Sequence, residues 1–295
     1  MCGKAWWLLL AVWLSAQAGA AVEVLDDRGK LIKLSQPAQR IISLAPHVTE
    51  LLFAAGAGDK IVGVVDYSNH PEAAKKIPNI GAYDNFDYER IKQLKPDLIV
   101  GWQSGNPAEK IAHLETLGFV VFLSEPRTFA GIASAVERFG QLSNNTASAH
   151  AAASEFTASI EQLRKRYRHQ AKVSLFYEIW NAPLMTLNGE HLFNQVAELC
   201  GANNVFASLP QLAPQISEEA VLAANPQMIL ASGMDANRPE WLDKWRRWPQ
   251  LQAVKNNHLY AVHPDLLQRQ SLRIADGAQQ VCAMVDQVRK TANKR

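Results

Sequence analysis

Short apolar runs alternate along the chain with stretches of helical periodicity. The segment RIISLAPHVTELLFAAGAGDKIVGVV, which begins at Arg40, predicts a strand ending at Leu44, a turn at Pro46, a helix over about 49–55 and a second strand over 61–65. A glycine pair in GAG ends the helix. This order of elements is a βαβ unit.

The same alternation continues on both sides of a long central stretch. Before that stretch we expect a helix over 88–94, a strand over 98–102, a helix with Asn106 as N-cap and Pro107 as its first residue, and a strand over 120–123. After it we expect a strand over 173–177, a helix over 192–199 with a glycine stop at Gly201, and a closing helix over about 272–290. Strands that alternate with helices imply parallel sheets covered on both faces.

The central stretch, residues 146–170, contains neither Gly nor Pro and places Phe156, Ile160, Leu163 and Tyr167 on one face of a single helix. It predicts a connector between two lobes. The domains we expect are a leader over 1–20, a hairpin region over 21–38, an N-terminal lobe over 39–145, the linking helix over 146–170 and a C-terminal lobe over 171–295. The hairpin follows from the alternation in VEVLDDRGKLIK, residues 22–33.

One unit of the pattern occurs once in each lobe. ERIKQLKPDLIVGW begins at Glu89 and EAVLAANPQMILAS begins at Glu219, and in each copy a proline follows the glutamate after seven residues (89 to 96, 219 to 226). Two pseudo-symmetric lobes would place both glutamates at equivalent positions on the surface. Coincidence is the alternative, because a helix, a proline and a buried strand are common in α/β proteins.

The first twenty residues, MCGKAWWLLLAVWLSAQAGA, combine one lysine, a short apolar run and an Ala-x-Ala end. That arrangement is typical of a secretory signal peptide, and neither this run nor any later segment reaches the length of a membrane span. The expected location is therefore an exported compartment. After the leader the chain keeps Cys200 and Cys282, an even pair that favours a disulfide, with two buried free thiols as the alternative.

Several functional classes find little support. The formal net charge of +2 and the lack of a basic stripe argue against nucleic-acid binding. Ser104 does not stand in a nucleophile elbow, so a serine hydrolase is unsupported. The eight histidines are scattered without ligand spacing, so we expect no dedicated metal site.

Aromatic residues cluster instead near the predicted strand ends, where ligand clefts of α/β sheets lie. They are Tyr67, Tyr83, Phe86, Trp102 and Trp180, and His47 stands in the first strand-to-helix turn beside Pro46. Aromatic walls with a few polar groups suit a large, flat, partly apolar ligand that is bound without covalent chemistry. Each of these residues has packing as its alternative role.

Three segments, RIISLAPHVTELLFAAGAGDKIVGV, DYSNHPEAAKKIPNIGAYDNFDYERIKQLKPDLIVGW and FNQVAELCGANNVF, resemble the periplasmic cobalamin-binding proteins of ABC importers. These belong to a wider class of helical-backbone binding proteins that also carry siderophores and haem. The likeness runs from about residue 40 to 288. It implies two α/β lobes joined by a rigid helix, with the ligand held in the cleft between them.

The resemblance also assigns roles to single residues. It implies that Tyr67, Tyr83 and Trp102 line the corrin site and that Asp265 and Arg269, in HPDLLQRQSLR, reach into the cleft from the second lobe. Pro46, His47 and Trp180 complete the candidate site. The chain departs from the family at Ala213, where a cleft tryptophan is expected, and at His47, which replaces a small residue.

Glu89 and Glu219 match the paired surface glutamates that dock onto the two permease subunits of the importer, and Cys200 and Cys282 match the family's disulfide. The expected function is therefore that of a monomeric, non-enzymatic periplasmic protein that captures cobalamin or a related corrinoid as cargo, without a cofactor, and presents it to an ABC importer.

Two alternatives stay open. One keeps the fold but binds haem or a ferric siderophore, which the hairpin at 22–33 and His47 favour. Arg269 fits either ligand, because it could meet an anionic siderophore or a corrin side chain. The other is an exported enzyme with Asp265 and His263 as acid and base.

Overall fold

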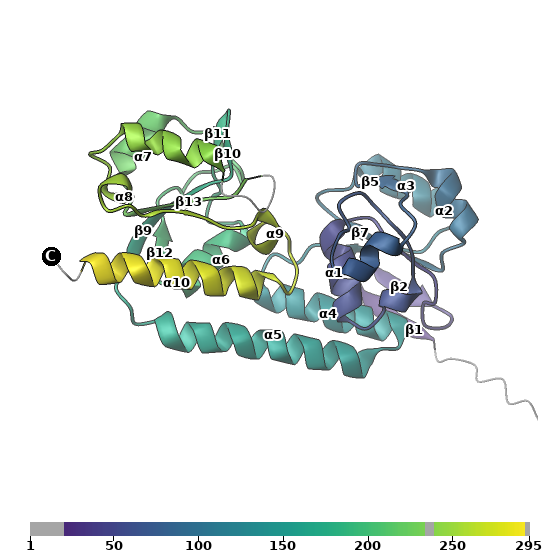
Figure 1. The fold of residues 1–295 in the computed structure, drawn as a ribbon. Helices are drawn as coiled ribbons and strands as arrows, with labels where there is room; N and C mark the ends of the chain where they lie inside the picture. The colour runs from purple at the N-terminus through teal and green to yellow at the C-terminus, as the bar shows by residue number, and fades with distance from the viewer. Residues whose placement is uncertain (1–20, 234–238, 293–295) are drawn as a thin grey trace, which may run out of the picture.

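Two α/β lobes stand side by side over a long helix in the computed structural model, which describes residues 21–233 and 239–292 (Figure 1). This confirms the predicted fold class. The expected signal peptide, residues 1–20, lies outside the described residues. Within the described ranges, no helix combines the length and apolarity needed to cross a membrane.

Each lobe is built on a four-stranded parallel sheet. The N-terminal sheet consists of β3 (Ile41–Ser43), β4 (Ile61–Val64), β7 (Leu98–Trp102) and β8 (Val121–Ser124), in the order β4-β3-β7-β8. The C-terminal sheet consists of β9 (Val173–Glu178), β12 (Ala202–Asn204), β13 (Met228–Ala231) and β14 (Leu259–Ala261), in the order β12-β9-β13-β14. Both sheets therefore order their strands second, first, third, fourth.

The apolar residues of these strands alternate between two cores, as a sheet covered on both faces requires. In β3, Ile41 joins the core shared with the long helices, whereas Ile42 joins the outer core of its own lobe. In β13, Leu230 and Ile229 divide in the same way. The shared core continues from one lobe to the other, and it makes their junction a packed joint rather than a flexible linker.

Helices and short hairpins complete the fold. The helices are α1 (Pro46–Ala54), α2 (Tyr88–Leu94), α3 (Ala108–Thr116), α4 (Phe129–Ser143), α5 (Thr146–Tyr167), α6 (Leu192–Leu199), α7 (Glu218–Ala224), α8 (Gln252–Lys255), α9 (Pro264–Leu267) and α10 (Ile274–Ala292). Single 3-10 segments cover Gly58–Lys60, Glu72–Lys76 and Glu240–Arg247. The hairpins pair β1 (Val22–Leu25) with β2 (Leu31–Leu34), β5 (Gly81–Ala82) with β6 (Asn85–Phe86), and β10 (Trp180–Asn181) with β11 (Leu184–Met185).

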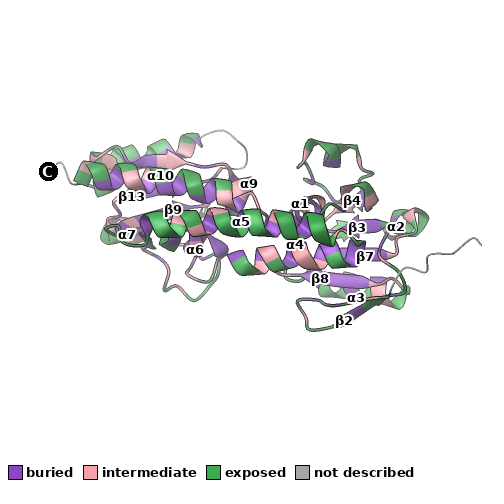
Figure 2. Cartoon of the chain, turned by 90° about the horizontal axis from the view of Figure 1, so that it is seen from below, coloured by how far each residue is buried: buried purple, intermediate pink, exposed green. Residues whose placement is uncertain are grey.

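Helix α5 is the expected connector, and it runs beneath both lobes (Figure 1). Phe156, Ile160 and Tyr167 are buried on one of its faces, as their spacing predicts, and the opposite face is exposed (Figure 2). Helix α4 packs along α5 and was not among the expected elements. The lobe boundaries at 39–145 and 171–295 stay predictions.

Two local expectations are wrong. Pro46 does not make a turn but is the first residue of α1, where its missing N–H costs nothing. Asn106 does not cap α3, whose N-cap is Pro107. The buried Asn106 amide instead accepts from the Trp102 N–H at 2.6 Å and donates to the carbonyl oxygens of Leu44 (3.0 Å) and Tyr83 (2.7 Å). It thereby ties three loop segments of the N-terminal lobe together.

The repeated unit has the same local structure in both lobes. An N-cap side chain, Asp87 or Ser217, accepts backbone N–H groups at the start of α2 or α7. Each helix ends in a left-handed residue, Lys95 (φ 46°) or Asn225 (φ 43°), just before the proline. The recurrence at 89 and 219 therefore reflects a repeated fold and not a coincidence of sequence.

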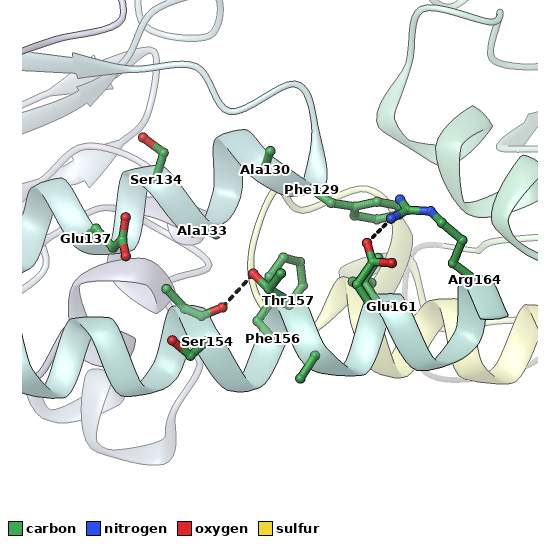
Figure 3. A pocket seen from close by; sticks show the side chains of 13 residues that line it. Phe129, Ala130, Ala133, Ser134, Glu137, Ser154, Phe156, Thr157, Glu161 and Arg164 are labelled. Atoms are coloured by element: carbon green, nitrogen blue, oxygen red, sulfur yellow. Dashed lines mark hydrogen bonds and ion pairs between the residues drawn. The ribbon is translucent and has the colours of Figure 1, made fainter.

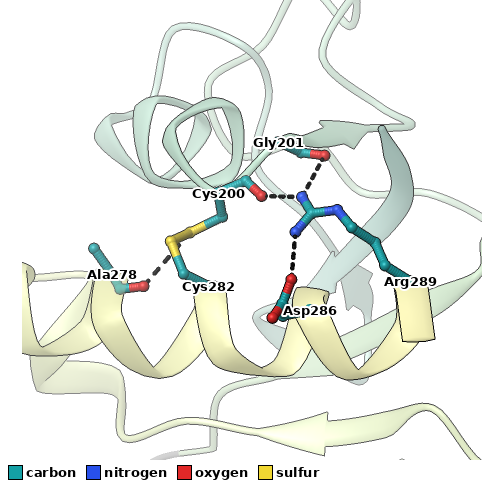
Figure 4. The surroundings of a disulfide bond; sticks show 6 residues. All are labelled: Cys200, Gly201, Ala278, Cys282, Asp286 and Arg289. Carbon is teal, nitrogen blue, oxygen red and sulfur yellow. Dashed lines mark hydrogen bonds and ion pairs between the residues drawn. A yellow bond between two sulfur atoms is a disulfide. The ribbon is translucent and has the colours of Figure 1, made fainter. Parts of the chain in front are cut away.

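The predicted disulfide joins Cys200, which follows α6, to Cys282 in α10 (Figure 4). Arg289, also in α10, donates to the carbonyl oxygens of Ala171 (2.7 Å) and Cys200 and pairs with Asp286 at 3.2 Å. The turn at Gly201 has a positive φ of 70° that favours glycine. The closing helix is thus held to the C-terminal lobe by covalent and polar contacts together.

Candidate functional site

A cleft of about 380 Å³ lies between the lobes, at the carboxyl ends of strands from both sheets. It is lined by Pro46, His47, Tyr67, Tyr83, Trp102, Ile179, Trp180, Gly233, Pro264, Asp265, Gln268, Arg269 and Gln270. Eight of the nine residues that the sequence suggested for the cleft are in this set, whereas Phe86 is buried in the outer core of the N-terminal lobe. The fold therefore brings to one place residues that lie far apart in the sequence, from Pro46 to Gln270.

The topology explains why these residues meet. In each sheet the first and third strands are neighbours, and their connections leave toward opposite faces, which opens a crevice beyond their carboxyl ends. Pro46 and His47 follow β3 and Trp102 ends β7, whereas Trp180 follows β9 and Gly233 follows β13. The crevices of the two sheets face each other across the cleft.

The N-terminal side of the cleft is largely aromatic. The rings of Tyr83 and Trp102 lie 6.0 Å apart, and the His47 ring meets Trp102 edge-on at 5.2 Å. Tyr67 is 76% exposed and has a left-handed φ of 61°, which is rare for a residue with a bulky side chain. An exposed aromatic ring held by an unfavourable backbone is typical of a binding surface.

His47 differs from its neighbours because it is buried, and its Nε2 atom has no hydrogen-bond partner among the described residues. Burial, followed by the positive charge of Arg269, lowers the pKa of His47 to about 3. The imidazole is therefore neutral at physiological pH. It contributes ring surface and an unpaired nitrogen to the cleft, and no charge.

The C-terminal side of the cleft is polar and comes mainly from α9 and the segment after it. Asp265 Oδ1 lies 3.0 Å from Arg269 Nε, and Asp265 Oδ2 lies 3.8 Å from Arg273 Nη1. His263 is the N-cap of α9 and accepts the backbone N–H of Asp265 at 3.1 Å. The ion pairs of the Asp265 carboxylate are thus with guanidinium groups, whereas His263 Nδ1 accepts a backbone N–H at the helix start.

Sequence reasoning missed part of the lining, namely Ile179, Gly233, Pro264, Gln268 and Gln270. The rule that clefts lie beyond strand ends could have found Ile179 and Gly233, which follow β9 and β13. Gln268 and Gln270 stand in the segment HPDLLQRQSLR, from which the resemblance assigned only Asp265 and Arg269 to the cleft. Ala213, the position where the family pattern has a cleft tryptophan, is exposed and outside this lining.

A larger groove of about 600 Å³ lies elsewhere, between α4 and α5 (Figure 3). Its walls come from two adjacent helices and carry several Ala and Ser residues, together with Phe129 and Phe156. Two of its charged residues, Glu161 and Arg164, lie one helical turn apart and form an ion pair with each other. We assign the site to the smaller cleft, because there aromatic and polar groups converge from both lobes.

Neither Glu89 nor Glu219 lines the cleft. Each is the second residue of its helix, and both are exposed. Glu89 pairs with Lys92 at 2.9 Å. The backbone N–H of Glu219 and the Ser217 hydroxyl lower the pKa of Glu219. Helices α2 and α7, which carry these glutamates, lie on the upper outer parts of the two lobes in Figure 1.

Comparison with known proteins places these features in context. A sequence model of the family described as periplasmic binding protein matches residues 41–266. Proteins named vitamin B12-binding protein are similar to the chain: one from Vibrio campbellii is 35% identical over 254 residues (86% of this chain, 92% of the relative), and one from Vibrio cholerae is 38% identical over 247 residues (83% and 88%).

Solved structures show the same likeness. The crystal structure of the periplasmic vitamin B12 binding protein BtuF of Vibrio cholerae has 36% identity and a TM-score of 0.79, over 86% of this chain and 99% of that chain. The periplasmic heme-binding protein RhuT from Roseiflexus sp. RS-1 has a TM-score of 0.75 at 20% identity, over 85% and 99%, which shows a shared fold alone.

Proposed function

The chain belongs to the periplasmic binding protein family, and from that premise we propose that it captures cobalamin or a close corrinoid in the cleft and delivers it to an ABC importer. The observation that carries the proposal is the convergence of Tyr67, Tyr83 and Trp102 with the polar α9 segment in one open cleft. The names of the relatives support cobalamin as the ligand.

The chemistry of the cleft supports binding without turnover. The aromatic faces of the N-terminal lobe offer apolar area to a flat ring system, and Asp265, Gln268 and Gln270 offer hydrogen-bonding groups to its polar periphery. The open cleft admits part of a large ligand and leaves the remainder outside. We further propose that residues 1–20 direct export, which places the binder in the periplasm with the rest of its family.

The first test is calorimetric titration of the protein from residue 21 onward with cyanocobalamin, cobinamide, haem and a ferric hydroxamate. We expect one-to-one binding of the corrinoids. Tight binding of haem or hydroxamate, with no corrinoid bound, would overturn the ligand assignment. The unpaired His47 nitrogen is the feature that would then deserve mutation, because a neutral imidazole is a common ligand of haem iron.

The role of the aromatic wall can be tested with Trp102→Ala and, as a matched control, Trp241→Ala, which removes an indole from the C-terminal lobe outside the cleft. Loss of a central aromatic contact should cost about 2 kcal/mol of binding free energy, or roughly thirtyfold in affinity. Equal effects of the two variants would argue against the cleft as the site.

We also propose that Glu89 and Glu219 dock the protein onto the two permease subunits of the importer. Their support is the matched position at the start of α2 and α7, one in each lobe. Exposed ion pairs contribute about 0–1 kcal/mol each, so the pair sets orientation more than affinity.

Docking is tested by Glu89→Lys combined with Glu219→Lys, assayed for stimulation of the importer's ATPase in proteoliposomes. We expect stimulation to be lost while cobalamin affinity is unchanged. The control is Glu155→Lys, a single charge reversal of the same kind at an exposed position of α5. Full stimulation by the double variant would refute the docking proposal.

A further inference from the structure

Arg269 is the cationic residue that lines the cleft among the described residues, and its guanidinium group contacts acceptors from both lobes. Its Nη1 donates to Glu50 Oε1 at 2.8 Å and to Asn69 Oδ1 at 2.9 Å, and its Nη2 donates to the Tyr67 carbonyl at 3.2 Å. Its Nε lies 3.0 Å from Asp265 Oδ1. The three hydrogen bonds use both Nη1 hydrogens and one Nη2 hydrogen, and the Nε side faces Asp265 as an ion pair, so the second Nη2 hydrogen is left for a ligand.

Glu50 is the central member of this cluster, although it does not line the cleft. It lies in α1, is 5% exposed, and also accepts from Ser271 Oγ at 2.6 Å, while Arg273 Nη1 lies 3.3 Å from its Oε1. Among its hydrogen-bond partners, Arg269 is the one that lines the cleft. Its three partners come from the other lobe, some 220 residues along the chain.

The charges of the cluster cancel. Arg269 and Arg273 carry one positive charge each, and Glu50 and Asp265 one negative charge each. The other polar lining groups on this side, Gln268 and Gln270, are amides. A ligand thus meets a cleft wall with hydrogen-bonding capacity and little net field.

Building on the proposed function, we infer that Glu50 is a specificity-determining residue that makes the cleft prefer a ligand with amide side chains over the same ligand with carboxylates. An amide oxygen accepts the remaining Nη2 hydrogen of Arg269, and an amide N–H donates to Asp265. A carboxylate at that place meets Asp265 without an uncommitted cation to balance it, because Glu50 already holds Arg269.

The clean test uses Glu50→Gln, because the amide keeps the shape and the contacts. Its oxygen can accept from Arg269 and Arg273, and its NH₂ can donate to Ser271 Oγ, which then accepts. The substitution therefore removes the negative charge while it keeps all three contact partners. The matched control is Glu155→Gln, the same change at an exposed position of α5.

The two ligands to compare are cyanocobalamin and its monocarboxylate derivatives, in which one side-chain amide is hydrolysed. The unmodified protein should bind at least one monocarboxylate about tenfold or more weakly than cyanocobalamin, and Glu50→Gln should narrow that ratio by about tenfold. Glu155→Gln should leave the ratio unchanged. A loss of packing alone would weaken both ligands equally, so the ratio separates specificity from structural damage.

If folded Glu50→Gln keeps the same ratio of affinities for cyanocobalamin and its monocarboxylates, the inference is overturned while the proposed function stands. Absence of cyanocobalamin binding by the unmodified protein overturns the proposed function itself. If Glu50→Gln does not fold, the unmodified protein still decides, because equal affinity for every monocarboxylate and for cyanocobalamin contradicts a preference for amides. Asp265→Asn then supplies the second variant, since it removes the other carboxylate held against Arg269 and should narrow the ratio in the same direction.

Discussion

The N-terminal lobe buries Glu50 and the C-terminal lobe buries Glu178, and the two lobes satisfy these carboxyl groups by opposite means. Glu50 meets Arg269, Ser271 and Arg273, all from the other lobe. Glu178, 2% exposed at the end of β9, accepts one bond from Trp245 Nε1 at 2.7 Å within its own lobe.

The consequence appears in the protonation of Glu178. Burial, only partly offset by the Trp245 bond, raises the pKa of Glu178 to about 8. A buried carboxyl group that meets cations can serve as a joint between lobes, whereas one that meets a neutral N–H keeps its proton. The shared topology of the lobes therefore does not decide their chemistry; the partners that each side chain meets decide it.

The lobes also differ in the contacts that stabilise them. The C-terminal lobe has the Cys200–Cys282 disulfide and the contacts of Arg289 with backbone carbonyls. The N-terminal lobe is joined to the remainder by apolar packing of α1 and α4 on α5 and by the contacts of Glu50. This difference predicts different responses to reduction and to mutation.

The largest effect should come from Glu50→Ala. Removal of the carboxylate leaves Arg269 and Arg273 without their shared partner at the junction, and breaking a buried pair in this way costs about 3–5 kcal/mol. Urea unfolding measures the free energy. The free energy of unfolding of Glu155→Ala, on the exposed face of α5, should stay within about 0.5 kcal/mol of that of the parent. A similarly small change for Glu50→Ala would contradict the role of Glu50 in joining the two lobes.

Loss of the disulfide should come next. Cys200→Ser with Cys282→Ser opens a loop with a sequence separation of 82 residues and should lower the free energy of unfolding by about 2–4 kcal/mol. Hydrogen exchange should rise in α6 and α10, while α1 and α4 keep their protection. Equal loss of protection in both lobes would show that the bond stabilises the whole molecule and not one lobe.

The smallest effect should be the pH response of Glu178. Its folded pKa of about 8 exceeds the ordinary value of 4.5, so the folded state binds the extra proton and stability falls as pH rises through this window. Between pH 6 and 8 the loss should be about 2 kcal/mol. Glu178→Gln should abolish this part of the slope in unfolding titrations, and an unchanged slope would contradict a protonated Glu178.

Much of the fold could be read from local patterns. The strand at β7 and the helices α2 and α6 have the expected bounds, because apolar periodicity and capping residues act over a few neighbouring positions. The predicted start of α3 was wrong because tertiary contacts competed with the local capping rule. Asn106 matches a helix N-cap by sequence, yet its side chain forms hydrogen bonds with backbone carbonyl and N–H groups of three loops instead.

The cleft shows the same division. Aromatic residues near strand ends could be listed from the sequence because parallel sheets direct their carboxyl ends to one edge, and the resemblance added Asp265 and Arg269. Glu50 gave no such signal, since it stands in an ordinary amphipathic helix and its partners lie more than 200 residues away.

The sequence by itself therefore determined the two-lobed α/β architecture, the connector helix, the disulfide pair and the aromatic side of the cleft, because each depends on periodicity, residue type or a recognisable motif. Only the tertiary structure decided which charges meet. Burial lowers the pKa of His47 and raises that of Glu178, and the contact with Glu50 across the lobes neutralises Arg269. Burial and contacts of this kind depend on where distant segments of the chain lie in space.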